Sequence, residues 1–129
     1  LHLRERDEAA YAAVVAARGD KEAMQRALLD AAAAPLAGAK AAVAVLRLSS
    51  DLLELNNPNL VSDVGCAAEF GYAALIGCAY NVRINHKFMK DESAIQAHRA
   101  ELDRLESDAS TLLAHVRAAV NRSLGVERP

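Results

Sequence analysis

The stretch SDVGCAAEFGYAALIGCAYNVRIN, Ser62 to Asn85, limits the possible folds more than any other part of the chain. It is long and apolar, and small residues dominate it. Small side chains bury little area each, so a helix of this composition needs close contact with many neighbouring helices. The whole chain shares this character, because its hydrophobic content is 53% while aromatic residues make up only 4%. We therefore predict an all-α fold, a bundle of long alanine-rich helices that completes its core with a second copy as an interlocked homodimer or a higher homo-oligomer.

Capping residues predict the first two helices. Gly19 is typical of a helix end and Asp20 of a helix N-cap, so a helix is expected over 4–18 and another from 21 to about 55. Pro35 lies inside the second helix. Because proline lacks a backbone N–H and clashes with the preceding turn, we expect a kink or a break there.

Two more helices are expected after the sequence NNPNLVS, which is typical of a turn. Ser62 is the expected N-cap of the third helix, and Asp91 or Ser93 is expected to start the last one. In the last helix, apolar residues recur every three or four positions and predict a narrow packing seam. The seam consists of Ile95, His98, Leu102, Leu105, Ala109, Leu112, Val116 and Val120. His98 is either a hydrogen-bonded packing residue or a ligand.

Charge and histidine spacing argue against two classes of partner. The formal net charge of -2 is unlike the basic excess of a nucleic-acid-binding surface, so no nucleic acid is expected. His2, His86 and His115 have no metal-ligand partner at a useful spacing, and the chain contains no HExxH motif or Cys–His cluster. We predict that the protein binds no metal.

The membrane and the redox compartment are also constrained. The segment 64–82 is long enough to cross a bilayer, but Glu69 lies inside it and no basic flank precedes it, so a buried helix and no membrane are predicted. Cys66 and Cys78 would lie about 18 Å apart along one helix, beyond disulfide reach. We expect buried thiols and a cytoplasmic protein.

Polar residues mark both ends of the apolar Ser62–Asn85 stretch. Asn81 and Asn85 share a helix face, and Asp63 projects in nearly the same direction five turns earlier. The distance from Asp63 to Asn81 along the helix is about 27 Å, too long for both to contact one small substrate. An antiparallel crossing of two copies would bring these ends together at an interface. Helix capping is the alternative, and it suits Asp63 better than Asn81.

Several segments resemble one protein family. NPNLVSD, then a small-residue helix, then NVRIN is similar to the cyclodeaminase/cyclohydrolase family of folate enzymes. RERDEAAYAAVVAA resembles the family's acidic helix, and ALLDAAAAPLAGA resembles its proline-containing helix. The similarity extends up to Asp91. Family members begin with a glycine-rich segment that is absent here, and they more often carry an aliphatic residue at His86. The resemblance implies one helical cyclodeaminase-like domain over 1–129, lacking that segment.

The resemblance implies a tetrahydrofolate derivative as substrate and no covalently bound cofactor. Cyclodeamination closes the ring of 5-formimino-tetrahydrofolate and expels ammonia, whereas cyclohydrolysis opens 5,10-methenyl-tetrahydrofolate with water; the sequence leaves both open. Both pass through a cationic amidinium carbon, which a carboxylate stabilises while it carries a proton. Asp7 is the first candidate for this role, followed by Glu5 and Asp63. An acidic residue near a helix start is also favoured by the helix dipole alone.

The resemblance also suggests binding residues. The amides of Asn81 and Asn85 each offer a donor and an acceptor, which matches the edge of a pterin. Arg83, Lys87 and Lys90 form a basic run suited to the glutamate tail, although a helix C-terminus favours positive charge in any case. Two alternatives are a non-catalytic helical dimer or folate-binding homologue that retains only the scaffold, and a generic helical interaction module.

Overall fold

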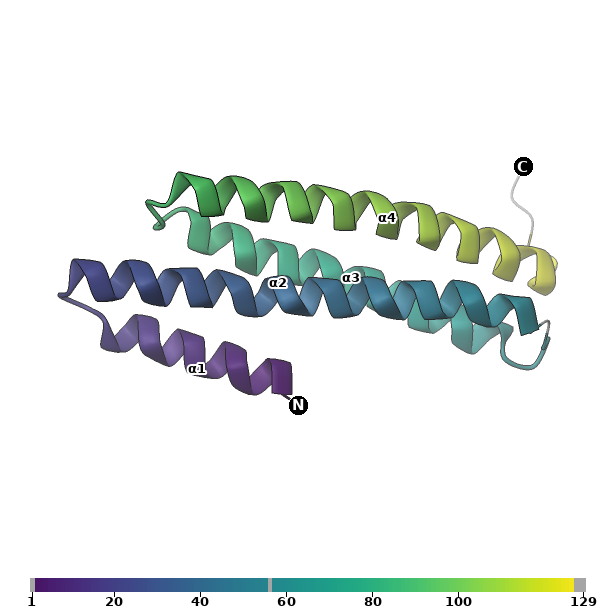
Figure 1. Ribbon diagram of the computed structural model, residues 1–129. Helices are drawn as coiled ribbons and strands as arrows, with labels where there is room; N and C mark the ends of the chain where they lie inside the picture. The colour runs from purple at the N-terminus through teal and green to yellow at the C-terminus, as the bar shows by residue number, and fades with distance from the viewer. Residues whose placement is uncertain (1, 56, 127–129) are drawn as a thin grey trace.

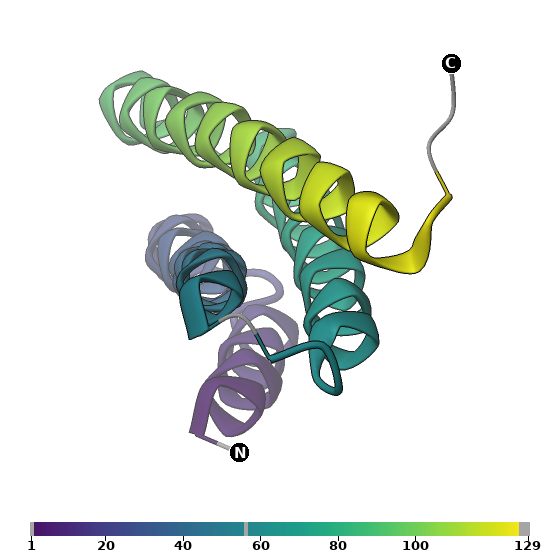
Figure 2. The ribbon, with the colours of Figure 1, turned by 90° about the vertical axis from the view of Figure 1, so that its right-hand side faces the viewer.

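The computed structural model describes residues 2–55 and 57–126. Over these residues the chain forms four α-helices and one short 3-10 helix: α1 (His2–Ala16), α2 (Lys21–Leu52), η1 (Leu53–Leu55), α3 (Val61–His86) and α4 (Glu92–Leu124). Figure 1 shows α2, α3 and α4 as three long rods that alternate in direction, with α1 folded back along the first half of α2. The end-on view in Figure 2 places α1 and α4 on opposite sides of the α2–α3 pair. The all-α prediction is confirmed.

The core lies where α2, α3 and α4 meet. The largest fully buried side chains come from all three helices: Leu46, Leu75, Val82, Leu102 and Val116. Alanines at the contact positions are equally buried and let the helix backbones approach closely. A Cβ added at Gly71 of α3, for example, would lie 3.4 Å from the Ala42 carbonyl of α2. The contact between α2 and α3 is the most extensive of all the helix pairs.

The turn between α1 and α2 follows the predicted capping chemistry. Gly19 has a φ of 95°, which is costly for residues with a Cβ. The Asp20 carboxylate accepts hydrogen bonds from the backbone N–H groups of Glu22 and Ala23, both at 3.0 Å. These bonds satisfy two of the donors that the start of a helix leaves free. Helix α2 therefore begins at Lys21, as expected.

Pro35 does not break α2, so the predicted break is wrong. The helix runs without interruption from Lys21 to Leu52, and Pro35 is buried within it. Proline has no N–H to donate to the carbonyl of Ala31, one turn earlier, and a buried carbonyl without a partner costs about 1–3 kcal/mol. Asn85 of α3 supplies the missing donor: its Nδ2 lies 3.1 Å from the Ala31 oxygen.

Helix α3 starts earlier than predicted, and Ser62 is not its N-cap. Leu60 precedes the first helical residue, Val61, and no side chain caps this end. The backbone N–H of Val64 already donates to the Leu60 carbonyl at 2.9 Å, so Ser62 lies within the first turn. In contrast, Asp91 caps α4 as expected, and its Oδ1 accepts from the Ala94 N–H at 2.9 Å.

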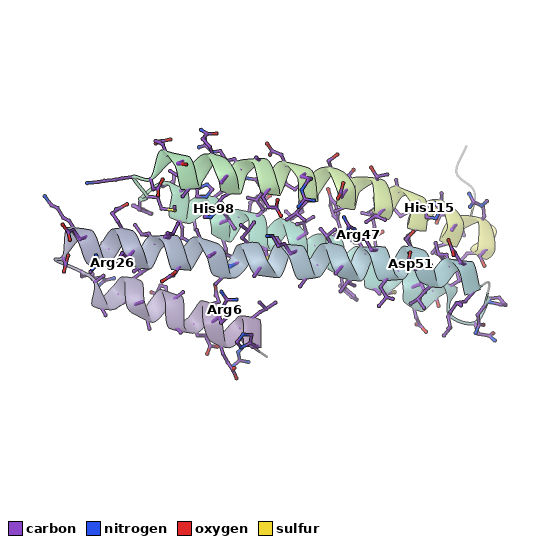
Figure 3. All side chains as sticks on the ribbon, in the orientation of Figure 1. Arg6, Arg26, Arg47, Asp51, His98 and His115 are labelled. Atoms are coloured by element: carbon purple, nitrogen blue, oxygen red, sulfur yellow. The ribbon has the colours of Figure 1, made fainter. Side chains whose placement is uncertain are left out.

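The predicted seam of α4 is largely buried, with one shift. Ile95, Leu102, Leu105, Ala109 and Val116 are buried against α2 and α3. Leu113 is 4% exposed and takes the core position predicted for its neighbour Leu112, which is half-buried. The side chains in Figure 3 show this helix alongside α2, with His98 near its start and His115 near its end.

The expectation for the cysteines needs correction. Cys66 is exposed and Cys78 is half-buried, and both thiols are free, so neither is the fully buried thiol predicted. Within residues 2–55 and 57–126, the helix that is long and apolar enough to cross a membrane by length and composition is Lys21–Leu55. Close to half of its most apolar window is buried by other parts of the chain, and the core helix of a soluble protein has the same length and composition.

Candidate functional site

The first catalytic candidates both lie on α1. Asp7 and Glu5 are both exposed. Arg6, between them, lies on the part of α1 that runs beside α2 in Figure 3. Burial raises the pKa of the Cys78 thiol of α3, and the negative charge of Asp7 raises it further. Asp7 belongs to a helix that packs mainly on α2.

Cys78 occupies space that a glycine of α2 leaves open. A Cβ added at Gly38 would lie only 2.8 Å from the Cys78 sulfur. Cys78 precedes Asn81 by three residues, so the two lie on neighbouring positions of one helix face. The charge of Asp7 thus acts on a thiol that lies about one turn from Asn81 on α3. Sequence reasoning predicted Cys78 as a buried thiol without a disulfide, and it missed the close approach of Cys78 to Gly38 of α2.

Asn81 and Asn85 occupy successive turns near the end of α3. Asn81 is exposed, and its Nδ2 donates to the Gly77 carbonyl at 3.2 Å. Asn85 is half-buried, and its Nδ2 donates both to the Asn81 carbonyl at 2.8 Å and to Ala31 at 3.1 Å. The described bonds of both amides thus use the NH₂ group as donor, and the Oδ1 atoms remain the natural acceptors for a ligand.

The basic run after Asn81 divides into two parts. Arg83 pairs with Glu106 of α4 at 2.9 Å, and this bond raises the pKa of Arg83. Its guanidinium therefore links α3 to α4. Lys87 and Lys90 are exposed in the turn between these helices. Gln25 of α2 holds that turn in place, since its amide donates to the Phe88 carbonyl and accepts from the Lys90 N–H.

Two histidines, one near the end of α3 and one near the start of α4, contact each other at this end of the bundle. His86 Nε2 and His98 Nδ1 are 3.2 Å apart, and the two rings stack with their centroids separated by 5.4 Å. Burial lowers the pKa of both imidazoles. His98 was predicted to be either a hydrogen-bonded packing residue or a ligand, and this contact agrees with the packing role. Within residues 2–55 and 57–126, no group of three His, Cys, Asp or Glu side chains could hold a metal ion.

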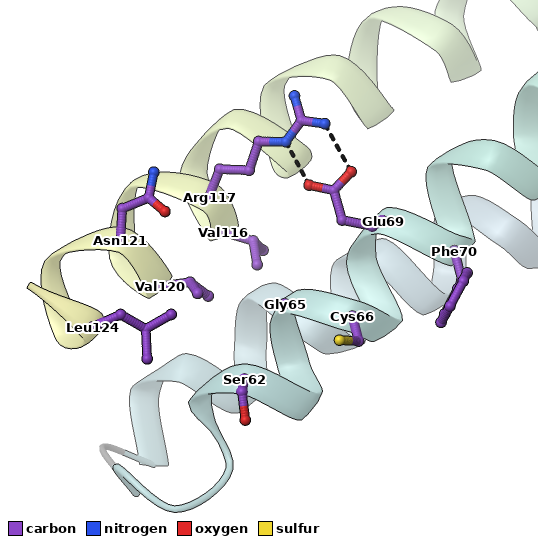
Figure 4. A pocket seen from close by; sticks show the side chains of 10 residues that line it. All are labelled: Ser62, Gly65, Cys66, Glu69, Phe70, Val116, Arg117, Val120, Asn121 and Leu124. Carbon is purple, nitrogen blue, oxygen red and sulfur yellow. Dashed lines mark hydrogen bonds and ion pairs between the residues drawn. The ribbon is translucent and has the colours of Figure 1, made fainter. Parts of the chain in front are cut away.

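Asp63 lies at the other end of α3, and one chain does not bring it to Asn81. It is exposed on the first turn, about 27 Å from Asn81 along the helix. A separate hollow of about 340 Å³ opens near this end, between the start of α3 and the end of α4 (Figure 4). Its walls include Gly65 and Val120, and a bidentate ion pair between Arg117 and Glu69 spans one edge at 2.6 and 2.7 Å. Sequence reasoning did not identify this hollow.

Known proteins match both the sequence and the fold. The family model of formiminotransferase-cyclodeaminase matches residues 1–104. Methenyltetrahydrofolate cyclohydrolase of Methylorubrum extorquens is 35% identical over 97 residues, which cover 75% of this chain and 46% of that protein. The crystal structure of formiminotetrahydrofolate cyclodeaminase from Thermotoga maritima matches with a TM-score of 0.91 and 26% identity, over 95% of this chain and 63% of that one.

The matches cover most of this chain but only part of each matched protein. The chain spans about half the length of the curated relative and less than two thirds of the solved structure. Within that span the agreement covers most of the chain in sequence, and nearly all of it in three dimensions. The chain therefore belongs to the formiminotransferase-cyclodeaminase family.

Proposed function

We propose that the protein is an enzyme of folate one-carbon metabolism, either a formimidoyltetrahydrofolate cyclodeaminase or a methenyltetrahydrofolate cyclohydrolase. The observation that carries the proposal is the agreement between family and geometry. The chain matches a cyclohydrolase in sequence and a cyclodeaminase in fold, and the charge of Asp7 acts on Cys78, which precedes Asn81 by three residues on α3. A carboxylate beside an amide suits a substrate that combines a cationic carbon with a pterin edge.

The chemistry assigned to Asp7 follows from the two reactions. In cyclohydrolysis a water oxygen bonds to the methenyl carbon and gives one proton to a base; the bond from that carbon to N5 then breaks, and N5 takes up the second proton of the water as the carbonyl forms. In cyclodeamination N10 bonds to the formimino carbon, and ammonia leaves after its nitrogen gains a proton. A carboxylate stabilises the cationic carbon in both reactions and carries the proton in each. Asp7 takes this role first, and Glu5 is the second candidate on the same helix.

The binding roles are distributed along the end of α3. Asn81 offers its Oδ1 to the N–H groups of the pterin, and Asn85 has only its Oδ1 left for this purpose because its NH₂ group is engaged. Lys87 and Lys90 are exposed cations suited to the glutamate tail. Arg83 contributes less to the tail, because Glu106 already neutralises its charge. The two free thiols favour a reducing, cytoplasmic setting.

The proposed site also includes a second copy of the chain. Helix α3 is apolar around its whole circumference, yet Phe70, Tyr80 and Ile84 are 75%, 67% and 48% exposed in the single chain. Exposed apolar side chains on one helix are typical of a contact surface. An antiparallel pairing of two α3 helices covers them and brings Asp63 of one copy towards Asn81 of the other. Asp63 joins the site only in such a dimer.

The enzyme proposal is tested by substitution of Asp7. The full-length protein is assayed with 5,10-methenyl-tetrahydrofolate, followed by the loss of its absorbance, and with 5-formimino-tetrahydrofolate, followed by ammonia release. Because general acid–base catalysis contributes about 10²–10⁴-fold, Asp7→Asn is expected to lower kcat/KM by that factor.

Glu8→Gln is the matched control, since Glu8 is a neighbouring carboxylate that pairs with Arg4 on the same helix. It should leave the rate near that of the wild type. Equal rates for Asp7→Asn and the wild type would remove Asp7 from its role. A wild-type protein that binds folates without turnover would support the scaffold-only alternative, and one that does neither would refute the proposed function.

A further inference from the structure

Pro35 and Asn85 are far apart in sequence but meet through one carbonyl group. In a regular helix the N–H of residue 35 would donate to the carbonyl of Ala31, and proline has no such donor. Ala31 and Pro35 are both buried in α2, so water is a poor substitute. The Nδ2 of Asn85, on α3, lies 3.1 Å from that carbonyl oxygen and donates to it.

The same amide reaches a second carbonyl, on its own helix. Asn85 Nδ2 also donates to the Asn81 carbonyl at 2.8 Å. Its two N–H bonds can therefore be divided between the two carbonyls, one on α2 and one on α3. This arrangement fixes the rotation of α3 about its axis and its position along α2 at the turn that carries Asn81. Only a side chain with two donors can do this, so an aspartate or a leucine at position 85 would leave the Ala31 carbonyl without a partner.

We propose that Pro35 and Asn85 form one positioning unit for the candidate site: the proline leaves a buried carbonyl of α2 open, and the asparagine that fills it holds the turn of α3 that carries Asn81 against α2. In this unit Asn85 positions the turn of α3 that carries Asn81, in addition to any contact that Asn85 makes with a ligand. Its consequence for folate binding rests on the proposed function, whereas the coupling between the two residues does not.

A double-mutant cycle on the full-length protein measures the coupling. Urea unfolding is followed for the wild type, Pro35→Ala, Asn85→Ala and the double variant. In the proline background, Asn85→Ala leaves the Ala31 carbonyl unpaired and is expected to lower the folding equilibrium constant by about tenfold or more. In the Pro35→Ala background the backbone N–H of residue 35 fills that role, so the same substitution is expected to cost no more than about threefold.

Asn81→Ala is the matched control, because the Asn81 side chain bonds to a carbonyl of its own helix. Its effect should be the same in the wild-type and Pro35→Ala backgrounds. Equal costs of Asn85→Ala in both backgrounds would overturn the proposal. Should Asn85→Ala fail to fold, recovery of the folded state by the added Pro35→Ala would support it, and failure of both variants to fold would overturn it.

Equilibrium dialysis with 5,10-methenyl-tetrahydrofolate separates positioning from direct contact. A positioning role predicts that Asn85→Ala weakens binding strongly when Pro35 is present and much less in the Pro35→Ala background. Equal weakening in the two backgrounds would show direct contact with the ligand and overturn the positioning role. If the wild type binds no folate at all, the proposed function fails, and the unfolding cycle alone decides whether the two residues are coupled.

Discussion

At the scale of single residues, the contact between His86 and His98 links stability to pH. The 3.2 Å contact between His86 Nε2 and His98 Nδ1 needs one donor and one acceptor, so it cannot form when both rings are protonated. The pKa of His86 is lowered by burial and by the positive charges of His98, Arg99 and Arg83. The pKa of His98 is lowered by burial, raised by Asp91 and lowered by Lys40.

These directions predict that the protein loses stability as the pH falls through about 6.5, the ordinary histidine pKa. In this range the unfolded chain takes up protons that the folded chain does not, so the free energy of unfolding decreases until the folded pKa values are passed. Urea unfolding between pH 7.5 and 5 measures the slope. His98→Gln should make the slope shallower, because one titrating ring is removed.

His115→Gln is the control, since His115 is an exposed histidine on the same helix. This variant should keep the wild-type slope. A wild-type protein whose stability is constant over that range, after correction for the acidic groups, would contradict the interpretation.

At the scale of helices, Asp20 and Ser62 test what capping contributes. Asp20 accepts two backbone N–H bonds at the start of α2, whereas Ser62 lies inside the first turn of α3 and caps nothing. Asp20→Ala is therefore expected to lower the free energy of unfolding by about 0.5–2 kcal/mol. Ser62→Ala should change it by less than about 0.5 kcal/mol, in line with a position that lacks a structural role. Thermal and urea unfolding of the two variants measure these changes in the free energy of unfolding. Equal losses for Asp20→Ala and Ser62→Ala would show that the side-chain cap at Asp20 adds no stability of its own.

The helix boundaries show which features of the fold could be predicted from the sequence. Gly19–Asp20 was predicted correctly, and Asp91 is one of the two residues predicted to start α4, because glycine is a local signal of a helix end and aspartate of a side-chain cap. The start of α3 was misplaced, because a serine beside an aspartate looks like a cap even where the backbone has already become helical. The donor that the Ala31 carbonyl receives beside Pro35 comes from Asn85 of another helix, and no local pattern reveals this tertiary partner.

In the candidate site as well, single residues could be proposed from the sequence, whereas contacts between helices could not. Motif resemblance identified Asp7 and Asn81, and the spacing of α3 placed Asn81 and Asn85 on one face. The effect of the Asp7 charge on Cys78, the pairing of Arg83 with Glu106 and the His86–His98 contact all join different helices. Such contacts depend on how the helices pack, so sequence reasoning could not assign them.

At the scale of the whole molecule, the exposed side of α3 predicts a dimer. Ala74 is exposed near the midpoint between Asp63 and Asn81, where an antiparallel pair of α3 helices would cross. Sedimentation equilibrium is expected to give twice the chain mass for the wild type. Ala74→Glu should shift it to the monomer, because the twofold brings two negative charges together. Ala100→Glu, at an exposed alanine of α4, is the control and should remain dimeric. A wild type that stays monomeric at micromolar concentration would exclude the interface.

A dimer of this kind also makes a catalytic prediction, because each site takes Asp63 from one copy and Asn81 from the other. Asp63→Asn and Asn81→Ala should each be inactive alone. When the two variants are unfolded together and refolded as a mixture, half of the dimers contain one copy of each, and every mixed dimer has one intact site. Activity should therefore return to about a quarter of the wild-type value. If both residues served a site within a single chain, the mixture would stay as inactive as its components.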